Sequence, residues 1–214
     1  MQTRSDALRA RTCCAAFALA VTLTLAGCAT SAPERAPSKE ASIVATGTGF
    51  TVAEEVRIGD DARRQYAAAM QLLERNDLSQ GIALLNEVTK SAPRASAPFI
   101  DLGIAYGRSG DLDNGIASLE HAVALNPRHP VAYNELGMLY RKKGEFAKAR
   151  ASYEKALALS PQFHYARLNL AILCDIYLAD AACALDNYVA YQQAVPDDKN
   201  ASIWIADLRS RANK

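Results

Sequence analysis

Residues 99–127 read FIDLGIAYGRSGDLDNGIASLEHAVALNP, and residues 133–161 read YNELGMLYRKKGEFAKARASYEKALALSP. Both stretches follow one pattern: an aromatic residue, then Leu-Gly, then Tyr, Gly and Ala, and a closing proline. Successive closing prolines lie 34 or 35 residues apart, at Pro93, Pro127, Pro161 and Pro196. A period of this length indicates a chain built from repeated supersecondary units.

Each unit is predicted to contain two helices. Leu102 and Tyr106 lie four residues apart and therefore share one helix face. Gly103 is small where two helices must approach closely, and each closing proline stops the second helix. Asp77 and Asp111 stand where a side chain caps the start of the second helix. Because one unit cannot bury its own apolar stripe, about three must stack for stability.

These residues resemble the tetratricopeptide repeat, a 34-residue helix–turn–helix unit. The resemblance covers residues 60–196 and implies an all-α solenoid of about four repeats, at 60–93, 94–127, 128–161 and 162–196. The last repeat departs from the pattern: Cys174 replaces the tyrosine seen at Tyr140, and the turn near Asp180 is one residue longer. Residues 197–214 are expected to add a capping helix and a tail.

The N-terminus carries the pattern of an export signal. Residues 1–28 read MQTRSDALRARTCCAAFALAVTLTLAGC, with three arginines followed by an uncharged run from Thr12 to Gly27. That run is short for a membrane span but typical of a signal peptide. Leu25-Ala26-Gly27-Cys28 resembles the bacterial lipobox, which implies cleavage after residue 27 and lipid, such as palmitate, on Cys28. The alternatives are an ordinary secretory signal with a chance cysteine, and an uncleaved anchor.

The resemblance to a lipobox also implies where the protein resides. We expect a lipid-anchored, periplasm-facing protein of the cell envelope, and Ala29, rather than Asp, after the cysteine favours the outer membrane. Residues 28–59 are then a lipidated N-terminus and linker. Residues 43–58 are rich in apolar side chains for a spacer. Two interpretations stay open: this segment lies against the folded domain, for example in its groove, or it is a loosely ordered linker.

The charge balance excludes a dedicated nucleic-acid binder. The 214 residues contain 24 Lys and Arg against 23 Asp and Glu, for a net charge of +1. Removal of residues 1–27 leaves 21 basic and 22 acidic residues, so the mature chain has no basic surplus to attract nucleic acid or anionic lipid. Attachment to a membrane is therefore expected only through the lipid.

Cysteine usage agrees with export. Cys13 and Cys14 leave with the signal and Cys28 carries the lipid, so Cys174 and Cys183 remain as an even pair. One lies late in a predicted helix and the other early in the next, and an oxidising periplasm permits a disulfide between them. The alternative is two buried free thiols, which behave as small apolar groups.

The sequence shows no pattern of catalytic chemistry. His121, His129 and His164 fall in different repeats, and none has a partner at metal-ligand spacing. There is no glycine-rich phosphate loop and no G-x-S-x-G nucleophile motif. We therefore expect a protein that is not an enzyme, without metal, cofactor or small-molecule substrate.

The resemblance implies that the first helices of successive repeats line a concave groove. Apolar groove residues would supply affinity for an extended peptide or an amphipathic helix, while Arg108, Asn134 and Arg141 would fix its orientation. The alternative is that several of these side chains pack within the array. The predicted groove residues are Tyr66, Met70, Ile100, Ile104, Arg108, Val131, Asn134, Met138, Arg141, Tyr165, Leu168, Ile172 and Asp175.

Two function classes follow from the architecture. The chain resembles the tetratricopeptide lipoproteins of type IV pilus biogenesis, which implies a non-catalytic scaffold for protein partners of the cell envelope, in pilus, secretion or TonB-type machinery. The alternative is a docking regulator of a peptidoglycan synthase or hydrolase. Fold-level analogy alone does not decide between them.

Overall fold

The computed structural model describes residues 42–46, 49–54 and 56–212, which all belong to one compact unit. The predicted signal peptide, the predicted lipidation site Cys28 and the first part of the predicted linker lie outside these described residues. Among the described helices, none has both the length and the apolar character that crossing a membrane requires.

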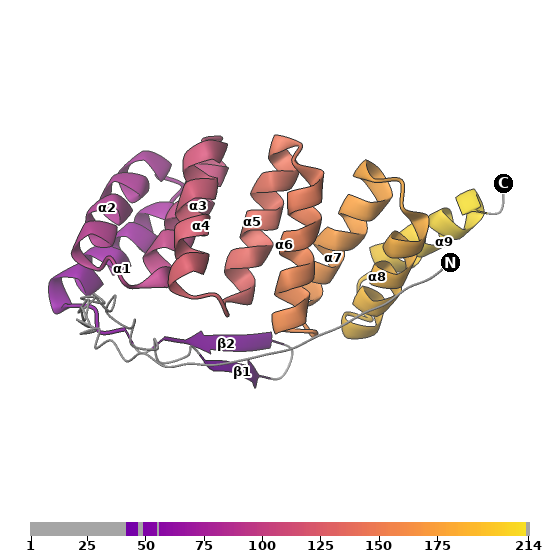
Figure 1. Cartoon of the computed structure of the whole chain (residues 1–214), viewed down its shortest axis with the longest axis horizontal. Helices are drawn as coiled ribbons and strands as arrows, with labels where there is room; N and C mark the ends of the chain where they lie inside the picture. Colours follow the sequence, from indigo (N-terminus) through magenta and orange to yellow (C-terminus); the bar gives the residue numbers. More distant parts are fainter. Residues whose placement is uncertain (1–41, 47–48, 55, 213–214) are drawn as a thin grey trace, which may run out of the picture. The chain divides into compact units, whose positions relative to one another are not determined.

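Helices dominate the described part of the chain and pack in sequence order, each against the next (Figure 1). Four helix pairs form the repeats, and we name the first helix of each pair the A helix and the second the B helix. The pairs are α1 (Asp60–Glu74) with α2 (Leu78–Ser91), α3 (Ser96–Ser109) with α4 (Leu112–Leu125), α5 (Pro130–Lys143) with α6 (Phe146–Leu159), and α7 (His164–Ile172) with α8 (Ala181–Ala194). The final helix α9 (Lys199–Ala212) packs on α8. The predicted all-α solenoid of four repeats and a capping helix is confirmed.

A recurring turn joins each A helix to its B helix. The residue before each B-helix cap has a left-handed backbone, with φ of 62° at Asn76, 90° at Gly110, 81° at Gly144 and 51° at Ala179. The next residue is the N-cap of the B helix, and in three repeats it is an aspartate whose side chain accepts a backbone N–H: Asp77, Asp111 and Asp180. Capping by Asp77 and Asp111 is confirmed.

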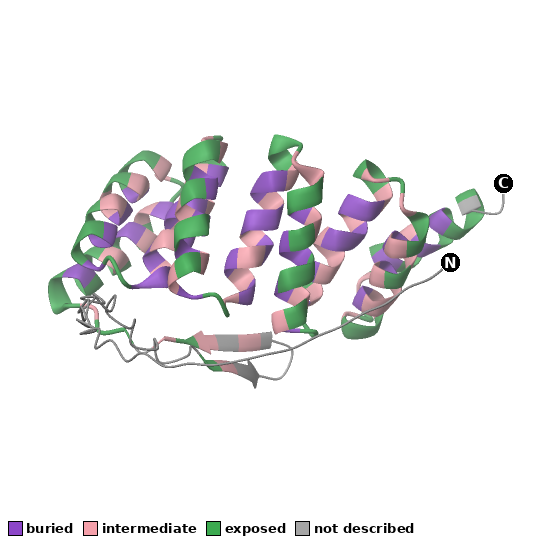
Figure 2. Cartoon of the chain, viewed as in Figure 1, coloured by how far each residue is buried: buried purple, intermediate pink, exposed green. Residues whose placement is uncertain are grey.

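The core lies between the helices and continues from one repeat to the next. Buried residues occupy the helix faces that meet their neighbours (Figure 2). The largest cluster extends from α3 to α9 and includes Leu119, Leu136, Tyr153 and Ile205. A Cβ on Gly103 would lie 2.5 Å from Leu119 Cγ, so the predicted close approach of α3 and α4 depends on glycine.

The fourth repeat accommodates one extra residue at the end of its A helix. In the first three repeats the N–H of the B-helix cap donates to a carbonyl five residues back, as from Asp111 to Tyr106. In the fourth, Asp180 N–H donates to Cys174 O, six residues back, over 2.9 Å. Here α7 continues as the π-helix η1 (Leu173–Tyr177). Because a π turn holds one residue more than an α turn, η1 absorbs the insertion that the sequence placed near Asp180.

The segment before the repeats forms a β-hairpin. Strand β1 (Ser42–Thr46) pairs antiparallel with β2 (Gly49–Ala53), with Ser42 opposite Ala53 and Thr46 opposite Gly49. Phe50 and Glu54 both contact the repeats, so the interpretation that this segment lies against the folded domain is correct. The suggested place in the groove is wrong, because the contacts are at the N-terminal ends of the A helices.

Candidate partner-binding face

The four A helices form a continuous surface, which we call the A-helix face. Side chains link each A helix to the next at a separation of one repeat. The Tyr66 hydroxyl on α1 donates to Asp101 Oδ2 on α3. Lys142 Nζ on α5 donates to Gly107 O on α3 over 3.2 Å, and Asn169 Nδ2 on α7 donates to Asn134 Oδ1 on α5 over 2.9 Å. These bonds hold neighbouring repeats in register.

One repeat position supplies a column of half-buried apolar side chains on this face. Each member packs against the core on one side and keeps part of its surface exposed. The column consists of Met70, Ile104, Met138 and Ile172, all of which the sequence predicted. Tyr66 and Leu168 are also half-buried, while Tyr165 is 60% exposed. Partly covered apolar side chains of this kind can bury further area when a partner docks.

Two predicted groove residues are buried and offer a partner almost no surface. Ile100 is 5% exposed and belongs to the core, and Asn134 is 4% exposed. The Asn134 amide is committed within the array, because its Nδ2 donates to Glu135 Oε1 over 3.0 Å while its Oδ1 accepts from Asn169. The expectation that Asn134 orients a bound peptide is therefore wrong.

The predicted basic side chains are engaged within the array. Arg108 Nη2 donates to Leu73 O over 3.2 Å and to Asn76 Oδ1 over 2.9 Å, at the C-terminal end of α1. The C-terminal end of a helix favours a cation, because the last carbonyl groups of a helix lack hydrogen-bond partners within it. Arg141 instead lies over the Tyr177 ring, with 5.9 Å between the guanidinium carbon and the ring centroid. Both cations therefore make contacts that stabilise the array, and neither is free to bind a ligand in this structure.

Val131 and Asp175 also have partners within the fold. Val131 packs beside Phe163 in a small cluster that Phe50 of β2 covers. The Asp175 carboxylate on η1 accepts from Arg211 Nη2 of the capping helix over 2.7 Å. Neither residue belongs to the open part of the A-helix face.

A pair of carboxylates completes the A-helix face. Asp101 and Glu135 occupy the same position in successive repeats, and Asn169 occupies it in the next. Burial raises the pKa of both carboxyl groups, while the hydrogen bond from Tyr66 lowers the pKa of Asp101 and that from Asn134 lowers the pKa of Glu135. Sequence reasoning did not place this pair on the face; the signal that could have found it is the 34-residue spacing of Asp101 and Glu135.

The π-helix adds apolar surface that sequence reasoning missed. Ile176 is 66% exposed and Tyr177 is 45% exposed. Offsets counted from the repeat signature did not find them, because the inserted residue changes the direction of side chains after Cys174. The Tyr177 ring packs against Phe146, with 5.0 Å between the ring centroids.

Cys174 and Cys183 form a disulfide, with 5.9 Å between their Cα atoms. The bridge joins η1 to the first turn of α8 and so spans the insertion. Within the described ranges, the sole cluster of three potential metal ligands is Cys174, Asp180 and Cys183. Both sulfur atoms of that cluster belong to the disulfide, so they are not available as thiolate ligands in this state.

Comparison with known proteins defines the class of fold. Residues 100–172 match the family model of the tetratricopeptide repeat. No curated protein matches the sequence. The matched residues run from within α3 to the end of α7 and cover most of the second repeat and all of the third, in which the sequence signature is most regular.

Solved tetratricopeptide-type structures extend this likeness to most of the chain. MamA 41-end from Desulfovibrio magneticus RS-1 superposes with a TM-score of 0.66 at 18% identity, over 73% of this chain and 88% of that one. PilF from Pseudomonas aeruginosa gives a TM-score of 0.65 at 16% identity, over 72% and 70% of the two chains. A thermophilic TPR protein from Thermus thermophilus gives 0.59 at 24% identity, over 70% and 81%. At these identities the likeness establishes the fold alone.

Proposed function

We propose that the protein is a non-catalytic scaffold of the cell envelope that binds peptide or helical segments of partner proteins on its A-helix face. The observation that carries this proposal is the column of half-buried apolar side chains Met70, Ile104, Met138 and Ile172. A tetratricopeptide fold supports protein–protein interaction, and the fold likeness to PilF from Pseudomonas aeruginosa is consistent with an envelope role.

The face also defines the chemistry of the partner segment. Apolar side chains spaced along one side of a helix or an extended peptide would cover the column and supply affinity. Asp101 and Glu135 lie on the same face, and both carboxylates are partly desolvated. A lysine or arginine on the partner would pair with them and relieve the cost of holding an anion away from water. We therefore expect an apolar partner segment with at least one basic residue.

The lipid anchor is the second part of the proposal. Lipid on Cys28 would confine the scaffold to a membrane surface and limit its encounters to proteins at that membrane. Metabolic labelling with palmitate tests this part by itself: Cys28→Ser should abolish the label. Label that persists in the variant would remove the anchor from the proposal and leave the A-helix face untouched.

Two variants of the same charge change test the binding face. Met138→Glu places a carboxylate in the apolar column, so partner binding should fall at least about tenfold, because an apolar contact is lost and docking would bury a charged group against the partner's apolar side chains. Ala151→Glu is the matched control, since Ala151 is exposed on α6 and the new carboxylate has Lys148 and Lys155 within one helix turn. Circular dichroism checks that both variants retain the helicity of the natural chain.

The partner can be identified by photocrosslinking in living cells. A photoreactive residue at position 138 should trap a defined envelope protein, and one at position 151 should not trap it. Mass spectrometry of the adduct then names the partner. Recovery of pilus or secretion components would support the scaffold, whereas recovery of a peptidoglycan synthase or hydrolase would indicate the docking regulator. Equal trapping from both positions would exclude the A-helix face as the binding site.

A further inference from the structure

Residues 49–54 and 56–58, which we call the strap, run along one edge of the repeats, and β2 at their start is fully extended. Alternate residues of an extended chain point to the same side. Phe50, Val52 and Glu54 are all half-buried, whereas Ala53 is exposed. Phe50, Val52 and Glu54 therefore face the repeats, while Ala53 faces solvent.

The edge beneath the strap consists of the N-terminal ends of three A helices. Ala95, His129 and Phe163 are the N-caps of α3, α5 and α7 and recur every 34 residues. The strap meets them in reverse order, because Phe50 contacts Phe163 while Glu54 contacts the start of α3. Alternate residues of the strap thus contact different repeats: Phe50 contacts the fourth repeat and Glu54 contacts the second.

Phe50 is an aromatic anchor at the third of these helix ends. Its ring packs edge-on against Phe163, with 5.0 Å between the centroids and 82° between the ring planes. The same cluster contains Ala156 and Ala166 and borders Val131. The result is an apolar seat made by residues from α5, α6 and α7.

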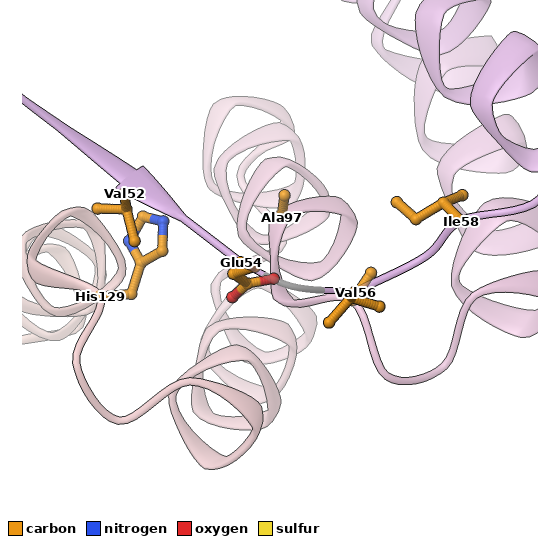
Figure 3. A pocket seen from close by; sticks show the side chains of 7 residues that line it. Val52, Glu54, Val56, Ile58, Ala97 and His129 are labelled. Atoms are coloured by element: carbon orange, nitrogen blue, oxygen red, sulfur yellow. The ribbon is translucent and has the colours of Figure 1, made fainter. Parts of the chain in front are cut away.

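Val52 takes the middle position, beside the N-cap of α5. Val52 and His129 line a cavity of about 220 Å³ together with Glu54, Val56 and Ile58 of the strap (Figure 3). Ala95 and Ala97 form the helical part of the lining. The strap therefore places an aliphatic side chain, Val52, at the middle position, next to this cavity.

Glu54 supplies a carboxylate to the N-terminus of α3. Its Oε2 accepts the Ser96 backbone N–H over 3.1 Å, and its Oε1 accepts the Ser96 hydroxyl. Asn126 Nδ2 also donates to Oε1, over 2.6 Å. Unpaired N–H groups and the dipole at a helix N-terminus favour an anion, and here two polar side chains add to them.

The Ser96 donors that bind the Glu54 carboxylate occur only at the start of α3 among these three helix ends. They therefore fix the register of the strap along the repeats. The residues equivalent to Ser96 are Pro130 in α5 and His164 in α7. Proline has no N–H and neither residue has a hydroxyl, so the Ser96 pair of donors is absent at those helix ends. A segment shifted by one repeat would lose these hydrogen bonds to its carboxylate.

We propose that this edge is a peptide-binding site for extended segments with an aromatic, an aliphatic and an acidic residue at alternate positions, and that the chain's own strap occupies it. Residues 50–54, Phe-Thr-Val-Ala-Glu, are the resident ligand. The site is separate from the A-helix face and does not depend on the scaffold function. A segment of the same pattern from another protein reaches it only when the strap leaves, because covalent connection gives the strap a high effective concentration.

A labelled peptide of residues 49–58, GFTVAEEVRI, tests the site in trans. The full chain with Phe50→Ala and Glu54→Ala has a weakened strap, so the peptide should bind this variant saturably, by fluorescence anisotropy. The natural chain should bind it at least about tenfold more weakly, because its strap competes. A peptide in which Phe50 and Glu54 are both alanine should show no saturable binding to either chain.

A further substitution tests recognition of the carboxylate. Asn126→Ala in the weakened chain should lower affinity for the peptide about tenfold, since a hydrogen bond to a charged group is lost. Met138→Glu in the same chain should leave the affinity unchanged, because it alters only the A-helix face. Absence of saturable binding to a weakened chain of normal helicity, or equal binding of the alanine peptide, would overturn the proposal.

Hydrogen exchange provides a second readout that does not require the double variant. Glu54→Gln keeps the shape of the side chain and removes its charge. The amides of residues 50–54 should then exchange at least about tenfold faster than in the natural chain, while those of α5 stay protected. Unchanged exchange in the strap would show that the carboxylate does not hold it, and would count against the proposal.

Discussion

The ring of Tyr153 lies against Gly137 so closely that a Cβ on Gly137 would come within 2.5 Å of the Tyr153 ring atom Cε1. This contact joins the B helix α6 to its A helix α5 and buries the tyrosine completely. The Tyr153 hydroxyl then has no hydrogen-bond partner among the described residues. A buried polar group without a partner costs stability.

Tyr153→Phe should therefore stabilise the protein by about 1 kcal/mol, because it removes an unsatisfied hydroxyl without changing the packing of the ring. Urea denaturation followed by circular dichroism measures the difference. Tyr140→Phe is the matched control: the Tyr140 hydroxyl donates to Glu120 Oε1 over 2.5 Å, so its removal should lower stability. A loss of stability in Tyr153→Phe would mean that its hydroxyl is satisfied in solution.

Ala179→Gly should also stabilise the protein, by about 0.5–1 kcal/mol. Ala179 holds the left-handed turn position with φ of 51°, which is costly for a residue with a Cβ and easy for glycine. The reverse change, Gly144→Ala, should cost about 1 kcal/mol. No atom lies within 4 Å of the added Cβ, so that cost reflects backbone conformation alone. Thermal unfolding that moves both variants in the same direction would contradict this account.

Loss of the disulfide should destabilise the fourth repeat. In the chain-entropy description a short closed loop of this kind contributes about 2–3 kcal/mol, so Cys174→Ser with Cys183→Ser should lower the free energy of unfolding by that amount. The natural chain in excess reductant should behave like the double variant. If reduction leaves the urea midpoint of the natural chain unchanged, the bridge does not contribute to stability.

His129 should make stability fall on acidification. Its Nδ1 accepts the Ala132 N–H as the N-cap of α5, and burial lowers its pKa below 6.5, although the Glu54 carboxylate opposes the shift. The unfolded chain therefore takes up the proton first as pH falls, and stability is lost from about pH 6.5 downward. His129→Asn keeps a capping acceptor that does not titrate. The difference in unfolding free energy between the two chains should shift in favour of the variant between about pH 7 and about pH 5.

Asp101 and Glu135 act with the opposite sign, because burial raises their pKa values and protonation of these carboxyls favours the folded state. Both groups are present in the natural chain and in His129→Asn, so the comparison cancels them. An equal pH dependence in the two chains would exclude His129 as the source of the acid sensitivity.

The repeat interval predicted the helices because each signature residue has a local structural role. Leu102 and Tyr106 share a face, Gly103 permits a close approach, and Asp111 caps the next helix. The same offsets predicted which residues point toward the A-helix face, but they could not predict how deeply each side chain is buried. At one repeat position Ile100 and Asn134 are buried whereas Tyr66 and Leu168 are half-buried, because burial depends on how closely the neighbouring helices pack.

The strap was beyond prediction for a different reason. The strap itself is not a repeat, and its contacts join positions far apart in the chain: Glu54 accepts hydrogen bonds from Ser96, 42 residues away, and from Asn126, 72 residues away. The apolar content of residues 43–58 showed that the segment needed a partner surface, but not which surface. The π-helix could be predicted in part. The repeat length revealed one extra residue in the fourth repeat, but only the backbone geometry showed that η1 absorbs it.

The strap should change how the repeat array unfolds. A solenoid whose repeats touch only their neighbours loses its terminal repeats one after another, and its energetics are those of a one-dimensional chain. Here a single segment spans from the second repeat to the fourth, so the middle of the array cannot loosen without also releasing Phe50 and Glu54. We expect these three repeats to melt together, as a domain with long-range closure does, and to refold more slowly than an unstrapped array of equal length.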